Sequence, residues 1–223
     1  MRAVIGITCI KGSVDQQVDV FSRAVAGAGA VPLFLPIPTE PEGLGPALGA
    51  LNGLLVTGED RDLTRPEQAA EAELVRLALR QDLPVLAVGG GLLFLNSVLG
   101  GENLSLGTGA TGHHQGSLPG NLAWHSLKVD PWSCLATYMG GSRFDVNSFH
   151  RVAVARPGVG LAVVGWSQDG AVEAVESRAH SFVVGIQFRP ELMAESHQRV
   201  FRAFRRSAES HRQRKRKLAL AAQ

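Results

Sequence analysis

The sequence predicts an α/β protein with a mostly parallel central sheet, helices on both faces of that sheet, and a C-terminal section of antiparallel strands. Two patterns carry this prediction. Between residues 3 and 101, short apolar runs alternate with segments whose apolar residues recur at helical spacing. After residue 123 the runs are short and β-rich, and the turn Gln168-Asp169-Gly170 between two of them indicates a hairpin.

Glycines and prolines delimit the elements of the first half. We expect helices over residues 14–28, over residues 67–81 and again after Gly91, and strands over residues 3–8, 31–35, 53–57 and 84–88. The proline-rich stretch of residues 36–46 is expected to cross the surface without regular structure. Because Thr8, Gly58 and Gly89 end three of these strands, we expect them at the carboxyl edge of the sheet, where parallel sheets bind ligands.

The second half begins with residues 102–123, which are polar, glycine-rich and aperiodic. They are expected to form a long loop near the carboxyl edge of the sheet, where a ligand would bind. His113 and His114 are adjacent in this loop and point in different directions in most backbone conformations, so we interpret them as loop residues and not as ligands. The strands expected next cover residues 125–129, 144–149, 152–155, 161–166, 171–176 and 181–188, and a final helix is expected from residue 194 onward. Asp169 and Glu173 fall on the hairpin, where a turn-forming, solvated role is favoured.

The composition is that of a well-cored globular protein. Of the 223 residues 45% are hydrophobic and 19% are charged, and we expect one domain over residues 1–208 followed by a basic tail over residues 209–223. No apolar run reaches the ~18 residues that a membrane span needs, and the first residues lack a signal-peptide pattern, so a cytoplasmic location is expected. Cys9 and Cys134 are far apart and have no metal-ligand spacing, which predicts free thiols. We expect no metal and no cofactor.

Charge is distributed unevenly along the chain. Residues 199–223 hold nine Lys and Arg and one acid, Glu209, which leaves 13 basic and 19 acidic residues in residues 1–198 and a net charge of −6 there. Basic residues commonly stabilise the carboxyl end of a helix, and this explanation is favoured over an anionic partner. Nucleic acid is the less favoured partner and would bind through residues 211–217. Because the cationic residues of that run repel one another, we expect disorder or a frayed helix beyond Ser210.

Residues 83–101 contain the feature from which a function can be argued. An apolar strand, residues 84–88, runs directly into Gly89, Gly90 and Gly91 and then into a helix. A strand that turns sharply into a helix exposes one side chain at the carboxyl edge of the sheet, close to the helix N–H groups, and this position commonly carries a nucleophile. Here the position is a glycine. Neither glycine pattern of a phosphate-binding loop fits, because bulky apolar residues follow the glycines at once.

Several segments carry a family resemblance. They are VIGIT (4–8), GLLVTG (53–58), LPVLAVGGG (83–91), LNSVLGG (95–101), VNSFH (146–150), DGAVEAVE (169–176) and VGIQFRPE (184–191). In this order they resemble the class I glutamine amidotransferase-like family, most closely its gamma-glutamyl-gamma-aminobutyrate hydrolase (peptidase C26) branch, over residues 3–206. The resemblance implies a Cys-His-Glu hydrolase of γ-glutamyl amides. In that chemistry a cysteine at the sharp turn from strand to helix, called the nucleophile elbow, attacks the amide. A histidine transfers the proton, and a glutamate orients the histidine.

The sequence departs from the family pattern where the chemistry would occur. The resemblance places Gly-Gly-Gly at residues 89–91, where the family has Cys-Arg-Gly, and Arg-Pro-Glu at residues 189–191, where it has His-Pro-Glu. Glycine cannot form an acyl-enzyme, and arginine, with a pKa above about 12, cannot accept a proton near neutrality. Glu191 keeps the family's glutamate but has no imidazole to orient. In the turn that resembles the oxyanion-stabilising turn of the family, Gly58 is followed by Glu59 in place of a second glycine, and a carboxylate there would repel an oxyanion.

These departures favour a pseudoenzyme with a binding or regulatory role, whose partner would be a small γ-glutamyl or anionic ligand, another protein or a second copy of the chain. An alternative is an active hydrolase of γ-glutamyl or related amides that uses Cys9, at the carboxyl end of the first strand, with His150, whose family counterpart helps line the ligand pocket. Asn147 and Ser148 could bind polar groups of a ligand or could satisfy the local backbone.

Arg189 is expected on the rim of the pocket, facing Gly89, in the place of the family's imidazole. A partly buried guanidinium without a partner would cost several kilocalories, so we expect a carboxylate to pair with it. Glu191 is the nearest candidate in sequence, and Glu59 is the alternative. The pair would either plug the pocket or hold an anionic group by charge-assisted hydrogen bonds.

Overall fold

The computed structural model of the protein describes residues 2–9, 16–37, 44–58, 65–106, 123–194 and 196–221. Its strands are β1 (Val4–Cys9), β2 (Val31–Pro36), β3 (Gly53–Val56), β4 (Val85–Val88), β5 (Glu102–Ser105), β6 (Ala123–Val129), β7 (Arg143–Ser148), β8 (Val152–Arg156), β9 (Leu161–Ser167), β10 (Val172–Ser177) and β11 (Val183–Ile186). Its helices are α1 (Gln16–Gly27), α2 (Leu44–Ala50), α3 (Arg65–Arg80), α4 (Gly90–Val98), α5 (Cys134–Met139), the short 3-10 helix η1 (Pro190–Leu192) and α6 (Arg199–Ala221).

In the described part of the chain, all strands belong to one sheet. Its order is β2-β1-β3-β4-β11-β10-β9-β6-β7, and β8 pairs with β10 and β5 beside this path. The strands from β2 to β11 run parallel, and those from β11 to β7 alternate in direction. This order confirms the expected parallel sheet with an antiparallel C-terminal section.

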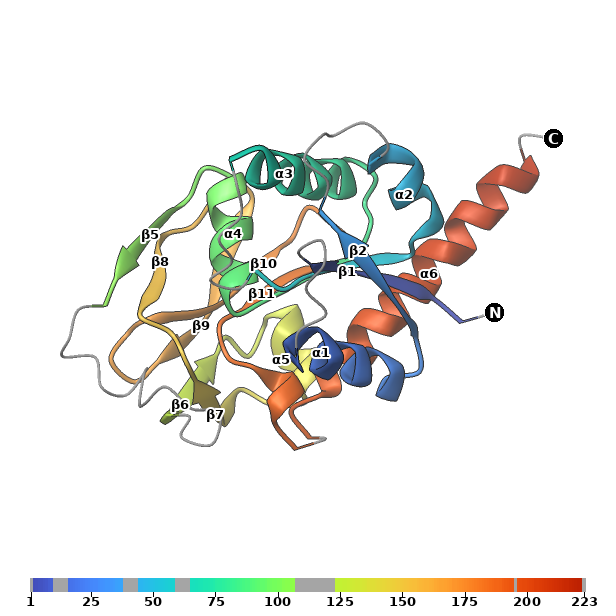
Figure 1. Ribbon diagram of the computed structural model, residues 1–223. Coiled ribbons are helices and arrows are strands. Elements are labelled where there is room, and N and C mark those ends of the chain that lie inside the picture. Colours follow the sequence, from blue (N-terminus) through green and yellow to red (C-terminus); the bar gives the residue numbers. More distant parts are fainter. Residues whose placement is uncertain are drawn as a thin grey trace.

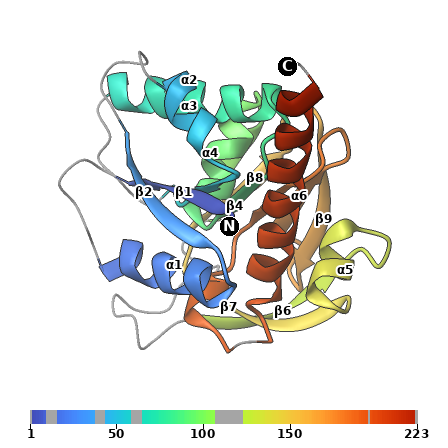
Figure 2. The same cartoon turned by 90° about the vertical axis from the view of Figure 1, so that its right-hand side faces the viewer.

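Helices cover both faces of the parallel half of the sheet (Figure 1, Figure 2). α2, α3 and α4 lie on one face, and α1, α5 and α6 lie on the other. Leu54 and Leu55, adjacent on β3, pack into opposite cores because successive side chains of a strand alternate between its faces. Leu74 of α3 lies in the same core as Leu54, and Phe204 of α6 lies in the same core as Leu55. Strands buried on both faces are apolar throughout, as the run Val85–Val88 shows.

Parts of two segments expected to be irregular form regular elements. α2 begins at Leu44, which is buried, although Pro46 follows it, because a proline in the first turn gives up an N–H that has no partner within the helix. β5 lies in the segment expected to be a long loop and pairs antiparallel with β8. The remainder of that segment, residues 107–122 with His113 and His114, lies outside the described residues.

α6 is a continuous helix to Ala221, so the expected disorder or fraying beyond Ser210 is wrong. Arginine, lysine, leucine and alanine are strong helix formers, and the basic run also contacts the body of the protein. Arg214 Nη2 lies 3.5 Å from the Asp82 carboxylate, and Lys215 donates to a backbone carbonyl of α2. Figure 1 shows the last turns of this helix leading away from the sheet. No helix in the described ranges is at once long and apolar enough to cross a membrane.

Candidate functional site

The turn from β4 into α4 has the sharp geometry expected of a nucleophile elbow. Gly89 precedes the helix with φ 60° and ψ −122°, a conformation that L side chains rarely adopt, and Gly90 begins α4. A Cβ atom on Gly91 would lie 2.0 Å from the carbonyl oxygen of Val56, and one on Gly58 would lie 2.2 Å from the amide nitrogen of Gly91. The elbow and the end of β3 are therefore in direct backbone contact, which glycines permit.

Gly89, by contrast, has room for a side chain. Among the described residues, a Cβ atom built on Gly89 meets only the Cδ atom of Arg189 within 4 Å, at 3.4 Å. The elbow position therefore faces Arg189, as the resemblance predicted. Arg189 lies in the direction that the side chain of a residue at the elbow would take.

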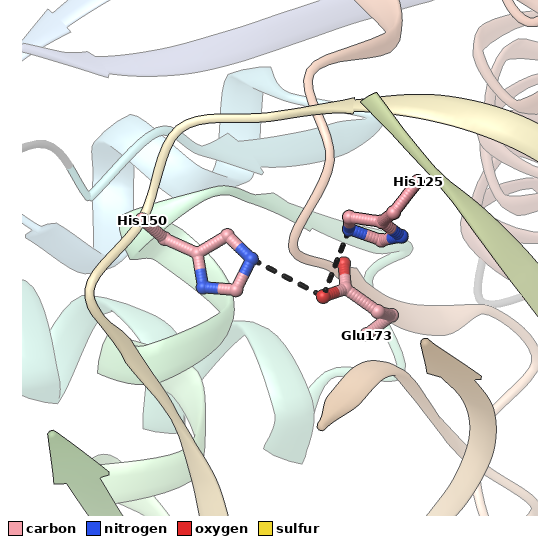
Figure 3. Close-up of side chains that lie close together, drawn as sticks. All are labelled: His125, His150 and Glu173. Atoms are coloured by element: carbon pink, nitrogen blue, oxygen red, sulfur yellow. Dashed lines mark hydrogen bonds and ion pairs between the residues drawn. The ribbon is translucent and has the colours of Figure 1, made fainter. Parts of the chain in front are cut away.

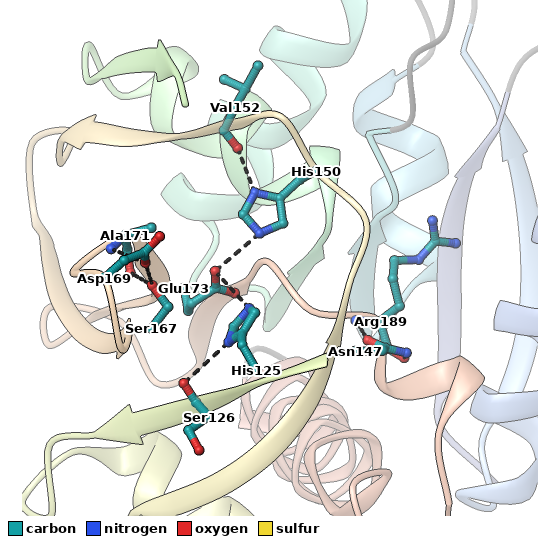
Figure 4. Close-up of polar contacts among 10 residues, drawn as sticks. All are labelled: His125, Ser126, Asn147, His150, Val152, Ser167, Asp169, Ala171, Glu173 and Arg189. Atoms are coloured by element: carbon teal, nitrogen blue, oxygen red, sulfur yellow. Dashed lines mark hydrogen bonds and ion pairs between the residues drawn. The ribbon is translucent and has the colours of Figure 1, made fainter. Parts of the chain in front are cut away.

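Asn147, Glu191 and Phe21 all contact Arg189, and Figure 4 shows Asn147 beside it. Its backbone N–H donates to Asn147 Oδ1 at 2.8 Å, and its carbonyl accepts from Asn147 Nδ2 at 2.9 Å. Its Nε donates to Glu191 Oε1 in an ion pair, and its guanidinium carbon lies 5.3 Å from the centre of the Phe21 ring. With 15% of its side chain exposed, Arg189 is not directed into bulk solvent. The expected pairing with Glu191 is thus confirmed, while Glu59 lies outside the described residues.

Glu191, in η1, is the fully buried member of this ion pair. Burial raises the pKa of its carboxyl above the usual value, although the charge and the hydrogen bond of Arg189 lower it in part. Its second oxygen, Oε2, has no hydrogen-bond partner among the described residues. The negative charge of Glu191 is therefore only partly compensated by its surroundings.

Asn147 and Ser148 end β7 beside this ion pair, and both are fully buried. The side-chain amide of Asn147 both donates to and accepts from the backbone of Arg189. Of the two roles considered for Asn147, the structure therefore shows the backbone role, which fixes Arg189 opposite the elbow. For Ser148 both roles stay predictions.

Cys9 and His150 are not brought together, so the pair considered as an alternative is wrong. Cys9 is buried at the end of β1, and β3, β4 and β11 lie between β1 and β10, the strand that carries Glu173. His150 Nε2 lies 3.1 Å from Glu173 Oε1. Four steps of about 4.8 Å across a sheet amount to about 19 Å, too far for a thiol and an imidazole to exchange a proton. Cys134 is exposed, and no disulfide joins the two cysteines, as expected.

His125, His150 and Glu173 form a buried cluster (Figure 3). His125 Nε2 lies 3.4 Å and His150 Nε2 lies 3.1 Å from the same oxygen, Glu173 Oε1. The glutamate side chain is 0% exposed, and the two imidazoles are 9% and 5% exposed. The other ring nitrogen of each histidine, Nδ1, lies near a backbone carbonyl oxygen, that of Ser126 at 3.3 Å for His125 and that of Val152 at 3.1 Å for His150.

The solvated role expected for Glu173 is wrong. Asp169 does form the turn, where its carboxylate accepts hydrogen bonds from Ser167 Oγ and the Ala171 N–H. Glu173 lies further along, within β10, where its side chain turns into the protein. The sequence-based interpretation also missed His125, because one histidine in a short β-type run has no local pattern that marks it.

The surroundings of Glu173 and His125 favour the ionised form of each. Burial alone raises the pKa of Glu173, but hydrogen bonds and charge from the two imidazoles outweigh burial and hold this pKa below its usual value. Burial alone lowers the pKa of His125, but Glu173 outweighs burial and raises this pKa above its usual value. The Gln187 N–H, two residues before Arg189, donates to the Glu173 carbonyl at 2.8 Å. The cluster and Arg189, which faces the elbow, therefore lie at the same edge of the sheet (Figure 4).

Sequence and fold comparisons agree with this architecture. Residues 3–191 match the peptidase C26 family. The chain is 30% identical over 218 residues to a Mycobacterium tuberculosis protein that bears the name "Putative glutamine amidotransferase Rv2859c", over 85% of this chain and 70% of that protein. It is 27% identical over 216 residues to the gamma-glutamyl-gamma-aminobutyrate hydrolase of Escherichia coli O157:H7, over 84% of this chain and 85% of that enzyme.

Among solved structures, the glutaminase domain of Trypanosoma brucei CTPS with bound acivicin has a TM-score of 0.73 to this chain. The match covers 93% of this chain and 94% of that one at 15% sequence identity, which shows a common fold. The fold is that of the class I glutamine amidotransferases, with its mixed sheet and its helices on both faces. By its match over residues 3–191, the chain belongs to the peptidase C26 family.

Proposed function

We propose that this protein is a catalytically degenerate member of its family, which binds a small γ-glutamyl or related anionic ligand at the elbow without hydrolysing it. One observation carries the proposal: Gly89 stands at the elbow without a side chain, and Arg189 lies opposite it. The resemblance assigns these two positions to the nucleophile and the base. Glycine cannot form a covalent intermediate, and a guanidinium cannot take a proton near neutral pH.

The surroundings of Gly89 support binding of an anion. The elbow keeps its strand-to-helix turn, so the N-terminus of α4 points to the place where the elbow side chain would be. Arg189 brings a positive charge to the same place, and a guanidinium recognises a carboxylate by charge-assisted hydrogen bonds. Arg189 offsets only part of the cost of burying the Glu191 charge. A ligand carboxylate would therefore compete with Glu191 for the same guanidinium.

Turnover tests the first half of the proposal. The full chain is assayed with γ-glutamyl-γ-aminobutyrate and with glutamine, with and without a thiol alkylator, and the Escherichia coli hydrolase serves as positive control. We expect no turnover, because the nucleophile and its base are both absent. A rate of about 1 s⁻¹, which is ordinary for an enzyme, would overturn the degenerate assignment.

Calorimetric titration tests the second half. We expect glutamate or γ-glutamyl-γ-aminobutyrate to bind the wild type, and Arg189→Met to weaken that binding by about 10- to 100-fold, the usual worth of a hydrogen bond to a charged group. The matched control is Arg178→Met, which removes an exposed arginine and should leave the affinity unchanged. Absence of binding to the wild type, or equal binding by the Arg189→Met variant, would overturn the binding role.

A further inference from the structure

The cluster of His125, His150 and Glu173 has the dimensions of a metal site. One ligand atom from each residue can be chosen so that all three lie within 4.8 Å of one another. The two nitrogen-to-oxygen distances are 3.1 and 3.4 Å. In a tetrahedral zinc site with bonds of about 2.0–2.2 Å, neighbouring ligand atoms are about 3.4 Å apart. The two nitrogen-to-oxygen distances therefore already suit a metal site, and the two nitrogens, within 4.8 Å of each other, need only approach to about 3.4 Å.

The histidine rings are oriented as metal ligands are. Nδ1 of His150 lies 3.1 Å from the Val152 carbonyl oxygen, and Nδ1 of His125 lies 3.3 Å from that of Ser126. An Nδ1–H bond to a carbonyl selects the tautomer whose Nε2 carries the lone pair, and it also fixes the plane of the ring. In both rings Nε2 is the atom that faces Glu173. The backbone therefore already provides the outer hydrogen bonds that orient two imidazole ligands.

The ligands also come from a rigid part of the fold. His125 lies on β6, Glu173 lies on β10, and β9 pairs with both of these strands. His150 lies two residues after the end of β7, which pairs with β6, in the short connection to β8. Ligands held by hydrogen-bonded strands keep their separation better than ligands on loops.

We infer that His125, His150 and Glu173 form a binding site for one divalent transition metal ion of the zinc class. Two imidazole nitrogens and a carboxylate oxygen suit Zn²⁺ or Co²⁺, whereas Mg²⁺ and Ca²⁺ prefer oxygen ligands alone. The described residues supply three ligands, and a tetrahedral site takes one further ligand in addition to these three. This site is separate from the proposed ligand site at Gly89 and Arg189, although both lie at one edge of the sheet.

The test uses the full chain, freed of metal by a chelator and titrated with Zn²⁺ alone in the absence of any γ-glutamyl compound. We expect one equivalent of Zn²⁺ to bind stoichiometrically and Mg²⁺ to show no binding. Co²⁺ should give the visible absorption bands of a four-coordinate site in the wild-type protein, a measurement that depends on no variant. Absence of stoichiometric Zn²⁺ binding, or of the Co²⁺ bands, would overturn the inference whatever the outcome of the ligand titrations.

Variants locate the site. Glu173→Gln keeps the size of the side chain and removes the charged ligand, so it should weaken Zn²⁺ binding by at least the roughly 10- to 100-fold that loss of an outer hydrogen-bonding partner costs. The matched control is His180→Gln, because His180 lies near Ser177 outside the cluster. Circular dichroism establishes that both variants are folded. If the Glu173→Gln variant binds Zn²⁺ as tightly as the wild type, the metal is bound elsewhere and the assignment fails.

Discussion

Two buried glutamates lie at the same edge of the sheet, and their surroundings push their pKa values in opposite directions. Both Glu173 and Glu191 have fully buried side chains. Two imidazoles contact Glu173 and hold its pKa below the usual value, whereas Glu191 has the Arg189 guanidinium and its pKa is raised. Burial opposes ionisation of both carboxyls, so the hydrogen bonds and charges around each one decide which form it takes.

The elbow and the cluster also differ in what they retain. The elbow keeps its backbone: Gly58 and Gly91 are packed so closely that the fold itself depends on them. The side chain at position 89 contributes nothing to that packing, so a nucleophile there can be absent without disturbing the turn. In the cluster the side chains themselves are in contact, and they hold β6 and β10 together with the end of β7. The elbow therefore keeps its backbone geometry although the side chain that the family's chemistry needs is absent.

The largest expected effect comes from removing each carboxylate in turn. In chelator-containing buffer at neutral pH, Glu173→Ala should lower the free energy of unfolding by about 3–5 kcal/mol, because it removes the buried oxygen that the Nε2 atoms of both imidazoles face. Glu191→Ala should cost less, because it also removes the burial penalty on the Glu191 charge, and the Arg189 side chain that it leaves is 15% exposed. Urea unfolding measures both, and Glu209→Ala, at a partly exposed pair with Arg205, serves as control. If Glu173→Ala and Glu191→Ala lower the free energy of unfolding equally, the two carboxylates contribute equally to stability and the comparison fails.

The next largest loss of stability is expected at the elbow, where Gly91 permits close backbone packing and Gly89 permits a positive φ. Gly91→Ala places a Cβ 2.0 Å from the Val56 carbonyl oxygen and should lower the free energy of unfolding by about 3 kcal/mol, although alanine is otherwise the better helix residue. Gly89→Ala meets only Arg189, at 3.4 Å among the described residues, and should cost about 1–2 kcal/mol for its positive φ. Urea unfolding of both variants decides. A Gly89→Ala variant less stable than Gly91→Ala would show that position 89 is itself a packing position.

Much of the fold could be predicted because its signals are local. Residues 85–88 are apolar throughout, as a strand buried on both faces requires, and the glycines that follow mark the turn into α4. The start of α2 was missed because Pro46 was interpreted as a helix breaker, although it lies in the first turn. The end of α6 was missed because the basic run was considered by its own repulsion, without the contacts that the rest of the chain supplies.

Part of the candidate site could be predicted from the sequence, and part could not. Gly89 and Arg189 could be placed opposite each other from the family resemblance, and the pairing of Arg189 with Glu191 from the cost of a buried charge. The cluster could not be found, because His125, His150 and Glu173 are far apart in sequence. Only the pairing of β6 and β10 with β9 brings them together, and no pattern within a single strand encodes that pairing.

A pH series sharpens the comparison at Glu191. A carboxyl whose pKa is raised by folding contributes stability that is fully present below its unfolded pKa, near 4.5, and is lost as pH rises through its folded pKa. Because glutamine resembles the protonated acid, Glu191→Gln should match the wild type near pH 4 and become the more stable of the two as pH rises toward 7.5. Thermal unfolding across this range measures the difference. A variant that is less stable than the wild type at pH 7.5 would show that Arg189 fully compensates an ionised Glu191.

The smallest effect concerns a carboxylate that is not buried. Asp82 is paired with Arg214 of α6 at 3.5 Å, and both side chains are about half exposed, at 48% and 50%. Solvent screens such a pair, so it contributes at most about 1 kcal/mol. Removing residues 211–223 deletes this pair and the Lys215 contact to α2 while leaving the buried face of α6 in place. We therefore expect the melting temperature to fall by about 2–4 °C in a protein of this size.

The control for this deletion is the full chain with Arg214→Gln, which removes only the ion pair with Asp82 and should account for part of the fall. If the deletion lowers the melting temperature by much more than about 4 °C, the end of α6 stabilises the body through more than exposed ion pairs. Since Leu218 and Leu220 are exposed, at 72% and 63%, such a result would also direct attention to these two side chains as a surface for a second chain. Sedimentation of the full and shortened proteins would then separate the two explanations, because a contact between subunits changes the mass and a contact within the chain does not.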